Sequence, residues 1–225
     1  MFVLNPLPQQ LPSALIAELV QVETATVGHF LHSGFVDPAI RAVLPDKRIA
    51  GTAVTLRIPH ADSTLLHYIL GLVRPGDFLV IDRCGDARHA CWGGVVTNTA
   101  KVAGVVGAVI DGVATDFNEV RRCDMPIWCR GPSPITTKLL GLEGAFNVPV
   151  SVGGQTVSPG DAVLADESGV LVLKPEQVDA VAKRALGMQE REITTLKRIH
   201  AGEKLADISG ATRLIEEANK RAAGK

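Results

Sequence analysis

Two short apolar segments that both end in aspartate place the strongest limit on the fold. They are FLVID at residues 78–82 and VVGAVID at residues 105–111, and a helical pattern from about Gly93 to Gly104 separates them. Apolar runs of this length on either side of a helix are typical of a β-α-β unit with buried parallel strands. The sequence therefore predicts an α/β domain whose loops gather at the carboxyl edge of a sheet, where ligands usually bind.

The chain divides into three segments around this unit. We expect residues 1–49 to be helical and irregular, residues 50–174 to form the α/β core, and residues 175–225 to form a helical tail with one long amphipathic helix. Short apolar runs between glycine-rich turns predict antiparallel hairpins over residues 126–173. All three segments belong to a single domain, because 225 residues is an ordinary domain length.

Composition and charge exclude several classes of protein. Apolar residues make up 46% and charged residues 21% of the chain, which is typical of a globular protein and not of a disordered one. The formal net charge of -1 gives no overall attraction to nucleic acid or to an anionic membrane. No window of 18 apolar residues and no secretory signal are present in the sequence. We expect a cytoplasmic protein that binds neither nucleic acid nor membrane.

The loop after the first aspartate-ended strand leads into Gly93-Gly94 at the start of a predicted helix. Free backbone amides and the helix dipole at such a position favour a carboxylate or a phosphate. Asp86 and Arg88 in this loop are therefore candidate substrate-binding residues, as are the two glycines. The alternative is that the glycines only allow close packing of helix and strand. A nucleotide is disfavoured, because neither a P-loop nor a dinucleotide fingerprint is present.

The loop after the second strand places Asp116 where two interpretations compete. Asp116 and Glu119 have the spacing of a capping box, so Asp116 is expected to cap the following helix in the simpler interpretation. In the functional interpretation Asp116 is an oxygen ligand of Mg²⁺ or Mn²⁺, which commonly takes one or two protein carboxylates. The spacing alone does not decide between them.

The order of motifs across about residues 50–205 resembles the RraA-like family. The resemblance rests on GDARHACWGGVVTNTAKVAGVVGAVIDGVATDFNEV, followed by CRGPSP, NVPVSVGG and VSPGDAVLADESGVLVL. This family includes the 4-hydroxy-4-methyl-2-oxoglutarate/4-carboxy-4-hydroxy-2-oxoadipate aldolases and the RraA regulators of RNase E. The resemblance implies a β/β/α sandwich with a mixed sheet, an N-terminal helical segment and a C-terminal amphipathic helix. It also implies a homo-oligomer, either a trimer or a hexamer of two trimers.

The family's aldolases carry Gly-Gly, then twenty residues, then Arg-Asp and, after two more residues, Glu or Asp. Here Gly93-Gly94 lie twenty residues before Thr115-Asp116, and Glu119 completes the pattern. The resemblance implies that Asp116 is the metal ligand, that Glu119 holds metal-bound water, and that the amides near Gly94 bind the substrate carboxylate.

Thr115 occupies the position at which those aldolases use an arginine to bind the 2-oxo acid and stabilise the enolate. A threonine hydroxyl is neutral, so an uncompensated loss of the arginine is expected to slow the chemistry roughly 10²–10³-fold. Three outcomes stay open. Another cation, Arg83, Arg88 or Arg130, replaces the arginine; or the substrate differs; or the lyase activity is lost.

Two further residues complete the candidate set. His89 lies in the first loop, and an imidazole can transfer protons near neutral pH, although a loop histidine is usually just exposed. The resemblance also implies that a glutamate on the C-terminal helix of a neighbouring subunit enters the site, and Glu192 lies nearest to that place.

The resemblance leaves two function classes. The leading one is a lyase dependent on Mg²⁺ or Mn²⁺ that acts on a small 2-oxo or hydroxy dicarboxylic acid, by retro-aldol cleavage to pyruvate or by decarboxylation. The presence of Asp116 and Glu119 favours it. The alternative is a regulator of the RraA type that binds a ribonuclease without chemistry of its own, which Thr115 keeps open. A methyltransferase is disfavoured, because no nucleotide-type glycine motif is present.

Overall fold

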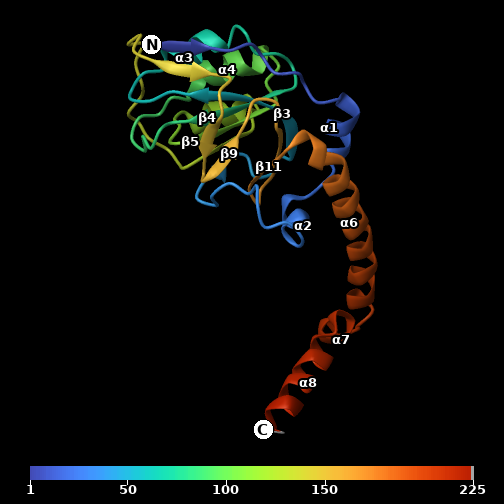
Figure 1. Cartoon of the computed structure of the whole chain (residues 1–225). Helices are drawn as coiled ribbons and strands as arrows, with labels where there is room; N and C mark the ends of the chain where they lie inside the picture. Colours follow the sequence, from blue (N-terminus) through green and yellow to red (C-terminus); the bar gives the residue numbers. More distant parts are fainter. Residues whose placement is uncertain (224–225) are drawn as a thin grey trace. The chain divides into compact units, whose positions relative to one another are not determined.

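The computed structural model describes residues 1–223. They fall into two compact units, with the division between Ala182 and Lys183. The first unit is built on a nine-stranded mixed sheet and a separate two-stranded hairpin (Figure 1). The sheet strands are β1 (Phe2–Leu4), β2 (Arg41–Ala42), β3 (Ile49–Arg57), β4 (Asp77–Asp82), β5 (Gly107–Asp111), β6 (Ile127–Cys129), β7 (Gly144–Phe146), β10 (Ala162–Ala165) and β11 (Val170–Leu173). The hairpin consists of β8 (Val150–Val152) and β9 (Gln155–Val157).

Four neighbouring parallel strands, β3, β4, β5 and β6, form the centre of this sheet. The helix α4 (Gly94–Val102) connects β4 to β5, so the predicted β-α-β unit is confirmed. Antiparallel pairing is confirmed for β8–β9 and β10–β11, but it is wrong for Ile127–Cys129. The short helix α5 (Phe117–Arg122) returns the chain to the same edge of the sheet, and β6 therefore runs parallel to β5.

The two faces of the sheet are covered differently, because alternate side chains of each strand point to opposite faces. Leu79 and Ile81 of β4 belong to one core with residues of α3 (Thr64–Ile69), α4 and α5. Phe78 and Val80 belong to a second core with the valines of β8 and β9. The predicted β/β/α sandwich is therefore confirmed.

The N-terminal segment contains two short helices, α1 (Ser13–Leu19) and α2 (Thr24–Gly28), and also contributes β1 and β2 to the sheet. The sequence pattern did not predict these strands. They are two or three residues long and carry no clear alternation, so their pairing with β6 and β7 decides their conformation.

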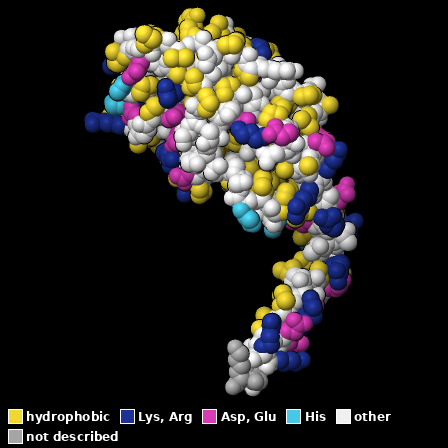
Figure 2. Space-filling model, viewed as in Figure 1, with side chains coloured by type: hydrophobic (Ala, Val, Ile, Leu, Met, Phe, Trp, Pro, Cys, Tyr) yellow, Lys and Arg dark blue, Asp and Glu magenta, His cyan; other side chains and the backbone are white. Residues whose placement is uncertain are grey.

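The described residues of the predicted C-terminal tail are largely helical, as expected, and residues 224–225 of that tail lie outside the described residues. A 3₁₀ turn at Pro175–Gln177 leads into α6 (Val178–His200), which is followed by α7 (Leu205–Ser209) and α8 (Ala211–Ala223). In Figure 2, charged and apolar side chains alternate along the C-terminal unit. Its exposed apolar side chains are Ile193, Leu196, Leu205, Leu214 and Ile215.

The boundary between the compact units falls after Ala182, inside α6. The division of the chain into segments 1–49, 50–174 and 175–225 stays a prediction. Within the described chain, no helix has both the length and the apolar composition that a membrane span requires.

Candidate functional site

Three loops that follow the parallel strands β4, β5 and β6 lie side by side at the carboxyl edge of the sheet. Isolated bridges pair Ala114 with Trp92 on one side and with Pro132 on the other. In addition, the amide of Thr115 donates a hydrogen bond to the carbonyl of Trp92 at 2.8 Å. These contacts bring the Gly93-Gly94 turn against Asp116, two features that the family resemblance assigns to one site.

The carboxylate of Asp116 does not cap the helix that follows it. Asp116 is the residue before α5 and has φ 54°, and its side chain makes no capping hydrogen bond to that helix. Instead, Oδ2 accepts a hydrogen bond from the amide of Gly94 at 2.8 Å, and Oδ1 accepts one from the hydroxyl of Thr115 at 3.3 Å. The capping interpretation is therefore wrong. The exposed carboxylate faces the beginning of α4.

The two glycines make room for this carboxylate. A Cβ at Gly93 would lie 2.9 Å from Asp116 Oδ2 and 2.9 Å from Thr115 Cγ2, and a Cβ at Gly94 would lie 3.1 Å from Glu119 Cγ. The glycines thus allow the loop that contains Asp116 to approach the beginning of α4. The close approach that they allow is between a loop and a helix, and not between a strand and a helix. Because Asp116 occupies the Gly94 amide, a bound anion would use the next amides of α4, which have no acceptor within the helix.

Substituting Gly93 by alanine is expected to disturb Asp116 without straining the backbone. The backbone at Gly93 is extended, with φ -146° and ψ -164°, which alanine adopts readily. The added methyl must displace Asp116 and Thr115, at a cost of about 1–3 kcal/mol in the free energy of unfolding, together with weaker Mn²⁺ binding. Urea unfolding and calorimetric Mn²⁺ titration measure both effects. Gly71→Ala is the control, since its Cβ meets only an ordinary contact at 3.5 Å; equal behaviour of the two variants would contradict the close approach.

The carboxylate of Glu119 is contacted by side chains of α4, of α5 and of Cys123, the residue that follows α5. Its carboxylate accepts hydrogen bonds from Arg122 Nη2 at 2.6 Å, Arg122 Nε at 2.9 Å and Asn98 Nδ2 at 2.8 Å, and the Cys123 thiol lies 3.4 Å away. The hydrogen bonds from Arg122 and Asn98 outweigh the effect of desolvation and lower the pKa of Glu119 to about 2. Glu119 is therefore a fixed negative charge beside Asp116 and a poor proton acceptor at neutral pH.

Removing Arg122 is expected to raise the pKa of Glu119 from about 2 towards its ordinary value of 4.5. A lowered pKa means that this ion pair stabilises the folded chain above about pH 4.5, and that the contribution is lost as the pH falls towards 2. Carboxyl-carbon NMR titration of Arg122→Ala measures the shift. Arg121→Ala serves as the control, because Arg121 contacts Asn118 and Phe117 instead. An unchanged Glu119 titration in Arg122→Ala would refute this cause.

The three arginines considered as replacements for the missing cation have different environments. Arg83 is fully buried and donates hydrogen bonds to the carbonyls of Ile58 and His60, both at 2.6 Å. Of the three possible replacements, Arg83 is therefore the one whose guanidinium is already engaged with backbone carbonyls in the interior. Arg88 is exposed, and its guanidinium has no hydrogen-bond or ion-pair partner among residues 1–223.

Arg130 already has two acidic partners. Its Nε donates a hydrogen bond to Asp111 Oδ1 at 2.6 Å, and its Nη1 lies 3.0 Å from Asp37 Oδ2. The structure therefore brings Arg130 to Asp111 and Asp37, not to Asp116, and its role as a substrate-binding residue stays a prediction.

Two other predicted residues are placed as follows. Asp86 lies in the loop after β4, where it accepts hydrogen bonds from Arg83 and from the backbone of Arg88 and His89. Glu192 lies on α6 in the second compact unit and is exposed. Their roles in substrate binding and in catalysis stay predictions.

Sequence reasoning missed Asn98 and Arg122. The spacing of Glu119 and Arg122 on one helix could have indicated an ion pair, because residues three apart are neighbours on a helix. Asn98 comes from a different helix, so no local pattern could have found it.

The donor set suits a hard divalent cation with few protein ligands. Among the described residues, no group of three or more His, Cys, Asp or Glu side chains is placed to hold a metal ion. The exposed oxygens of Asp116, in a recess that a Cβ at Gly93 would fill, provide a single carboxylate. One carboxylate fits Mg²⁺ or Mn²⁺, which keep several waters, and does not fit a structural zinc site.

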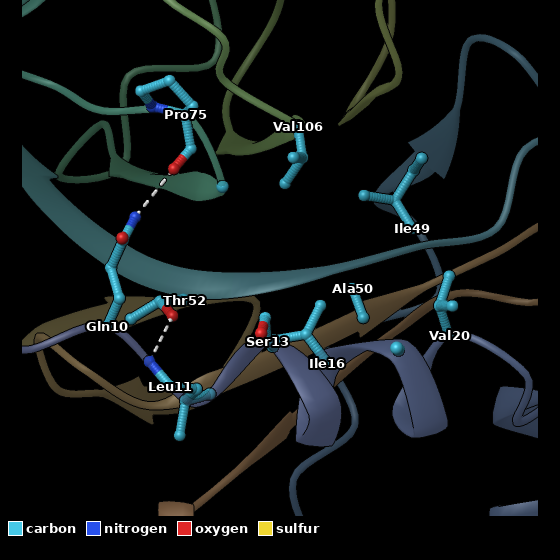
Figure 3. A pocket seen from close by; sticks show the side chains of 12 residues that line it. Gln10, Leu11, Ser13, Ile16, Val20, Ile49, Ala50, Thr52, Pro75 and Val106 are labelled. Atoms are coloured by element: carbon cyan, nitrogen blue, oxygen red, sulfur yellow. Dashed lines mark hydrogen bonds between the residues drawn. The ribbon is translucent and has the colours of Figure 1, made fainter.

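A cavity at the opposite, amino edge of the parallel strands does not include this site (Figure 3). It has a volume of about 380 Å³ and is mainly apolar, with Ile16, Val20, Ile49 and Val106 among its lining residues. None of the predicted site residues lines it. The candidate site is therefore defined by the loops at the carboxyl edge.

Comparison with known proteins agrees with the fold and the motifs. The RraA-like family model, described as Aldolase/RraA, matches residues 22–172. A protein of Halalkalibacterium halodurans named "Putative 4-hydroxy-4-methyl-2-oxoglutarate aldolase" is 33% identical over 146 residues, which cover 65% of this chain and 69% of the relative. An Arabidopsis thaliana protein with the corresponding name, numbered 3, is 34% identical over 127 residues, covering 56% and 75%.

Among solved structures, Streptomyces coelicolor RraAS2 is described as an unusual member of the RNase ES inhibitor RraA protein family. It superimposes with a TM-score of 0.74 at 30% identity and covers 84% of this chain and 98% of its own. The family match spans more than half of the chain and includes all three loops of the candidate site. The chain belongs to the RraA-like family.

Proposed function

We propose that this protein is a divalent-metal-dependent carbon–carbon lyase that acts on a small 2-oxo or hydroxy dicarboxylic acid. The reaction is a retro-aldol cleavage that releases pyruvate, or a decarboxylation of an oxaloacetate-like acid. The observation that carries the proposal is the carboxylate of Asp116, which is exposed, turned away from its own helix and held by the Gly94 amide. The aldolase names of relatives at 33% and 34% identity support the reaction class.

Asp116 is the residue that would hold Mg²⁺ or Mn²⁺. When bound, the cation would supply Lewis-acid polarisation of the substrate's keto group. The hydroxyl of Thr115, which donates to Asp116 Oδ1, orients the carboxylate. Glu119 adds a second negative charge, and the hydrogen bond that it accepts from Asn98 joins α5 to α4.

The substrate's carboxylates are recognised by the first amides of α4 and by Arg88. The amides of Val95 and Val96 have no acceptor within the helix, and the nine-residue α4 directs the positive end of its dipole towards them. Arg88 supplies a positive charge for a substrate carboxylate, because its guanidinium is exposed and makes no ion pair within the described chain. It does not replace the arginine that the aldolases place at the enolate oxygen, where this chain has Thr115. Arg88→Ala should therefore raise the KM, and an unchanged KM would remove Arg88 from the site.

The site is completed by a neighbouring subunit in a trimer or hexamer. Glu192 is exposed on α6, and apolar side chains on the same helix, Ile193 and Leu196, are also exposed. If Glu192 enters the site of another copy, then mixing inactive Asp116→Asn and Glu192→Gln proteins restores part of the activity. If mixed oligomers of the two variants stay inactive, sharing between subunits is excluded.

The decisive experiment is a screen of 2-oxo and hydroxy dicarboxylic acids in a pyruvate-coupled assay, with a separate assay of released carbon dioxide. Each is run with Mg²⁺, with Mn²⁺ and with a chelator. We expect turnover of at least one acid that depends on the metal. Turnover that persists with the chelator would contradict the proposal, as would a complete lack of turnover together with a lack of oxalate binding.

A protein-binding regulator is the second candidate. The structural likeness to RraAS2, which belongs to an RNase ES inhibitor family, favours it, as does the neutral Thr115. The two functions differ in their need for metal. A regulator binds its ribonuclease in the presence of chelator, whereas the lyase binds oxalate or pyruvate only with Mg²⁺ or Mn²⁺.

A further inference from the structure

The loop after β4 contains a histidine whose ring is bonded to a carboxylate. His89 Nδ1 lies 3.0 Å from Asp86 Oδ2 and 3.3 Å from Oδ1. Asp86 in turn accepts a hydrogen bond at 2.9 Å from Nη2 of Arg83, whose side chain is fully buried. The amides of Arg88 and His89 donate to Asp86 Oδ1 at 2.9 and 3.0 Å. Five contacts therefore fix the carboxylate against the ring.

These contacts determine which nitrogen of His89 carries a proton. Burial of Asp86 opposes its ionisation, but the hydrogen bonds from the Arg88 and His89 amides and from the His89 ring, with the charge of Arg83, lower its pKa. An ionised carboxylate only accepts hydrogen bonds, so the neutral ring presents Nδ1–H to Asp86. The lone pair is then on Nε2, which has no hydrogen-bond partner among the described residues, and 31% of the side chain is exposed.

The His89 loop and the Asp116 loop are joined through Ser133. The hydroxyl of Ser133 donates to the carbonyl of Arg88 at 2.7 Å, and its amide donates to the carbonyl of Ala114 at 2.9 Å. Arg88 directly precedes His89, and Ala114 lies two residues before Asp116. The path from His89 to Asp116 therefore crosses three residues of chain and two interstrand spacings. Its upper limit is about 20 Å, since a strand rises about 3.3 Å per residue and neighbouring strands lie about 4.8 Å apart. Two side chains, a cation and a dicarboxylic acid span a distance of this order.

The site lacks another free base in these loops. Asp116 is assigned to the cation, and both carboxylate oxygens of Glu119 already accept hydrogen bonds, from Arg122 and from Asn98. A retro-aldol reaction needs a group that takes a proton from a hydroxyl and returns it to carbon. An imidazole with one nitrogen fixed and the other free meets this need, as in other sites where a carboxylate orients a histidine.

We propose that His89 is a catalytic acid–base residue of the lyase, and that Asp86 and Arg83 are its positioning residues. Nε2 accepts the proton of the substrate hydroxyl, whose O–H electrons form the new carbonyl. The electrons of the breaking carbon–carbon bond form the enolate of the 2-oxo acid. The imidazolium then returns the same proton to the enolate carbon, so the ring ends neutral. This inference rests on the proposed function.

One half of the reaction, the proton transfer, can be measured separately. The methyl hydrogens of pyruvate exchange with D₂O, and NMR measures the rate of this exchange in the presence of Mg²⁺. We expect the wild-type protein to catalyse exchange and His89→Ala to slow it about 10²-fold, with unchanged binding of oxalate and Mg²⁺. His89→Gln and His89→Asn should not restore the rate, because a side-chain amide neither gains nor loses a proton near neutral pH. His67→Ala is the control, since His67 is exposed on α3.

Addition of free imidazole distinguishes the loss of a catalytic group from a folding defect in His89→Ala. It should raise the exchange rate of His89→Ala, in which removal of the ring leaves a space, and should not raise that of Asp116→Asn. Wild-type exchange rates in His89→Ala, with activity otherwise intact, would overturn the assignment of His89 alone. A wild-type protein that neither exchanges pyruvate nor cleaves any dicarboxylic acid would instead overturn the proposed lyase.

The tautomer of His89 provides a test that needs no activity. Nitrogen-15 NMR of the wild-type protein should show the neutral ring protonated on Nδ1, and Asp86→Asn should increase the Nε2–H form. A wild-type ring that is mainly protonated on Nε2 would contradict the positioning role of Asp86 and, with it, the proposal.

Discussion

Asp116→Ala and Asp116→Asn are expected to lower metal-dependent turnover by about 10³-fold or more. Among the described residues, Asp116 is the single carboxylate at this site that is placed to bind a cation. A Lewis acid at a developing enolate contributes several kcal/mol to catalysis, so its loss has a large effect on the rate. Turnover is measured with Mg²⁺ on the best acid from the screen. Because the carboxylate is exposed, neither variant should lose more than a little stability.

Asp124→Asn is the matched control for this experiment. Like Asp116, Asp124 is an aspartate with a positive φ, in this case 50°, and it lies just after the end of α5. Its side chain is paired with Lys47, and it lies outside the three loops of the candidate site. The control should keep its turnover. If Asp116→Asn were as active as Asp124→Asn, the proposed metal centre would be in the wrong place.

Thr115→Arg is expected to increase pyruvate release from 4-hydroxy-4-methyl-2-oxoglutarate by roughly 10²–10³-fold. A threonine hydroxyl is neutral, whereas an arginine at this position is placed beside Asp116 and can donate charge-assisted hydrogen bonds to an enolate oxygen. Initial rates of coupled pyruvate formation measure the gain.

Thr115→Gln controls for side-chain length without the charge, and it should show little gain. Equal rates in Thr115→Arg and the parent chain would mean that the threonine is not what separates this protein from the aldolases that it resembles. In that case a different substrate, or recognition by Arg88, would explain the replacement.

The sequence predicted the central sheet well, because its evidence is local. The apolar runs ending at Asp82 and Asp111 and the helical pattern between them determine the β-α-β unit without reference to the rest of the chain. The direction of β6 could not be predicted from the residues of that strand alone. It depends on α5, a helix of six residues that is too short to show a periodic pattern.

The sequence singled out Asp116 and Glu119, but it did not indicate their contacts. Asp116 and Glu119 have a spacing that suits both a helix cap and a ligand, and only the position of Gly94 in space decides between them. Arg83 shows the same limit. Its burial depends on carbonyl groups of Ile58 and His60, more than twenty residues earlier in the chain, and no pattern around Arg83 indicates them.

Calorimetric titration of Mn²⁺ in the presence of oxalate is the most direct test that Asp116 anchors a cation which in turn binds a 2-oxo acid. The wild-type protein should bind Mn²⁺ and oxalate together, each raising the affinity for the other, because linkage between two ligands is reciprocal. Asp116→Asn should bind neither, while Asp124→Asn should match the wild type. Oxalate that binds equally well without Mn²⁺, or to Asp116→Asn, would contradict the account.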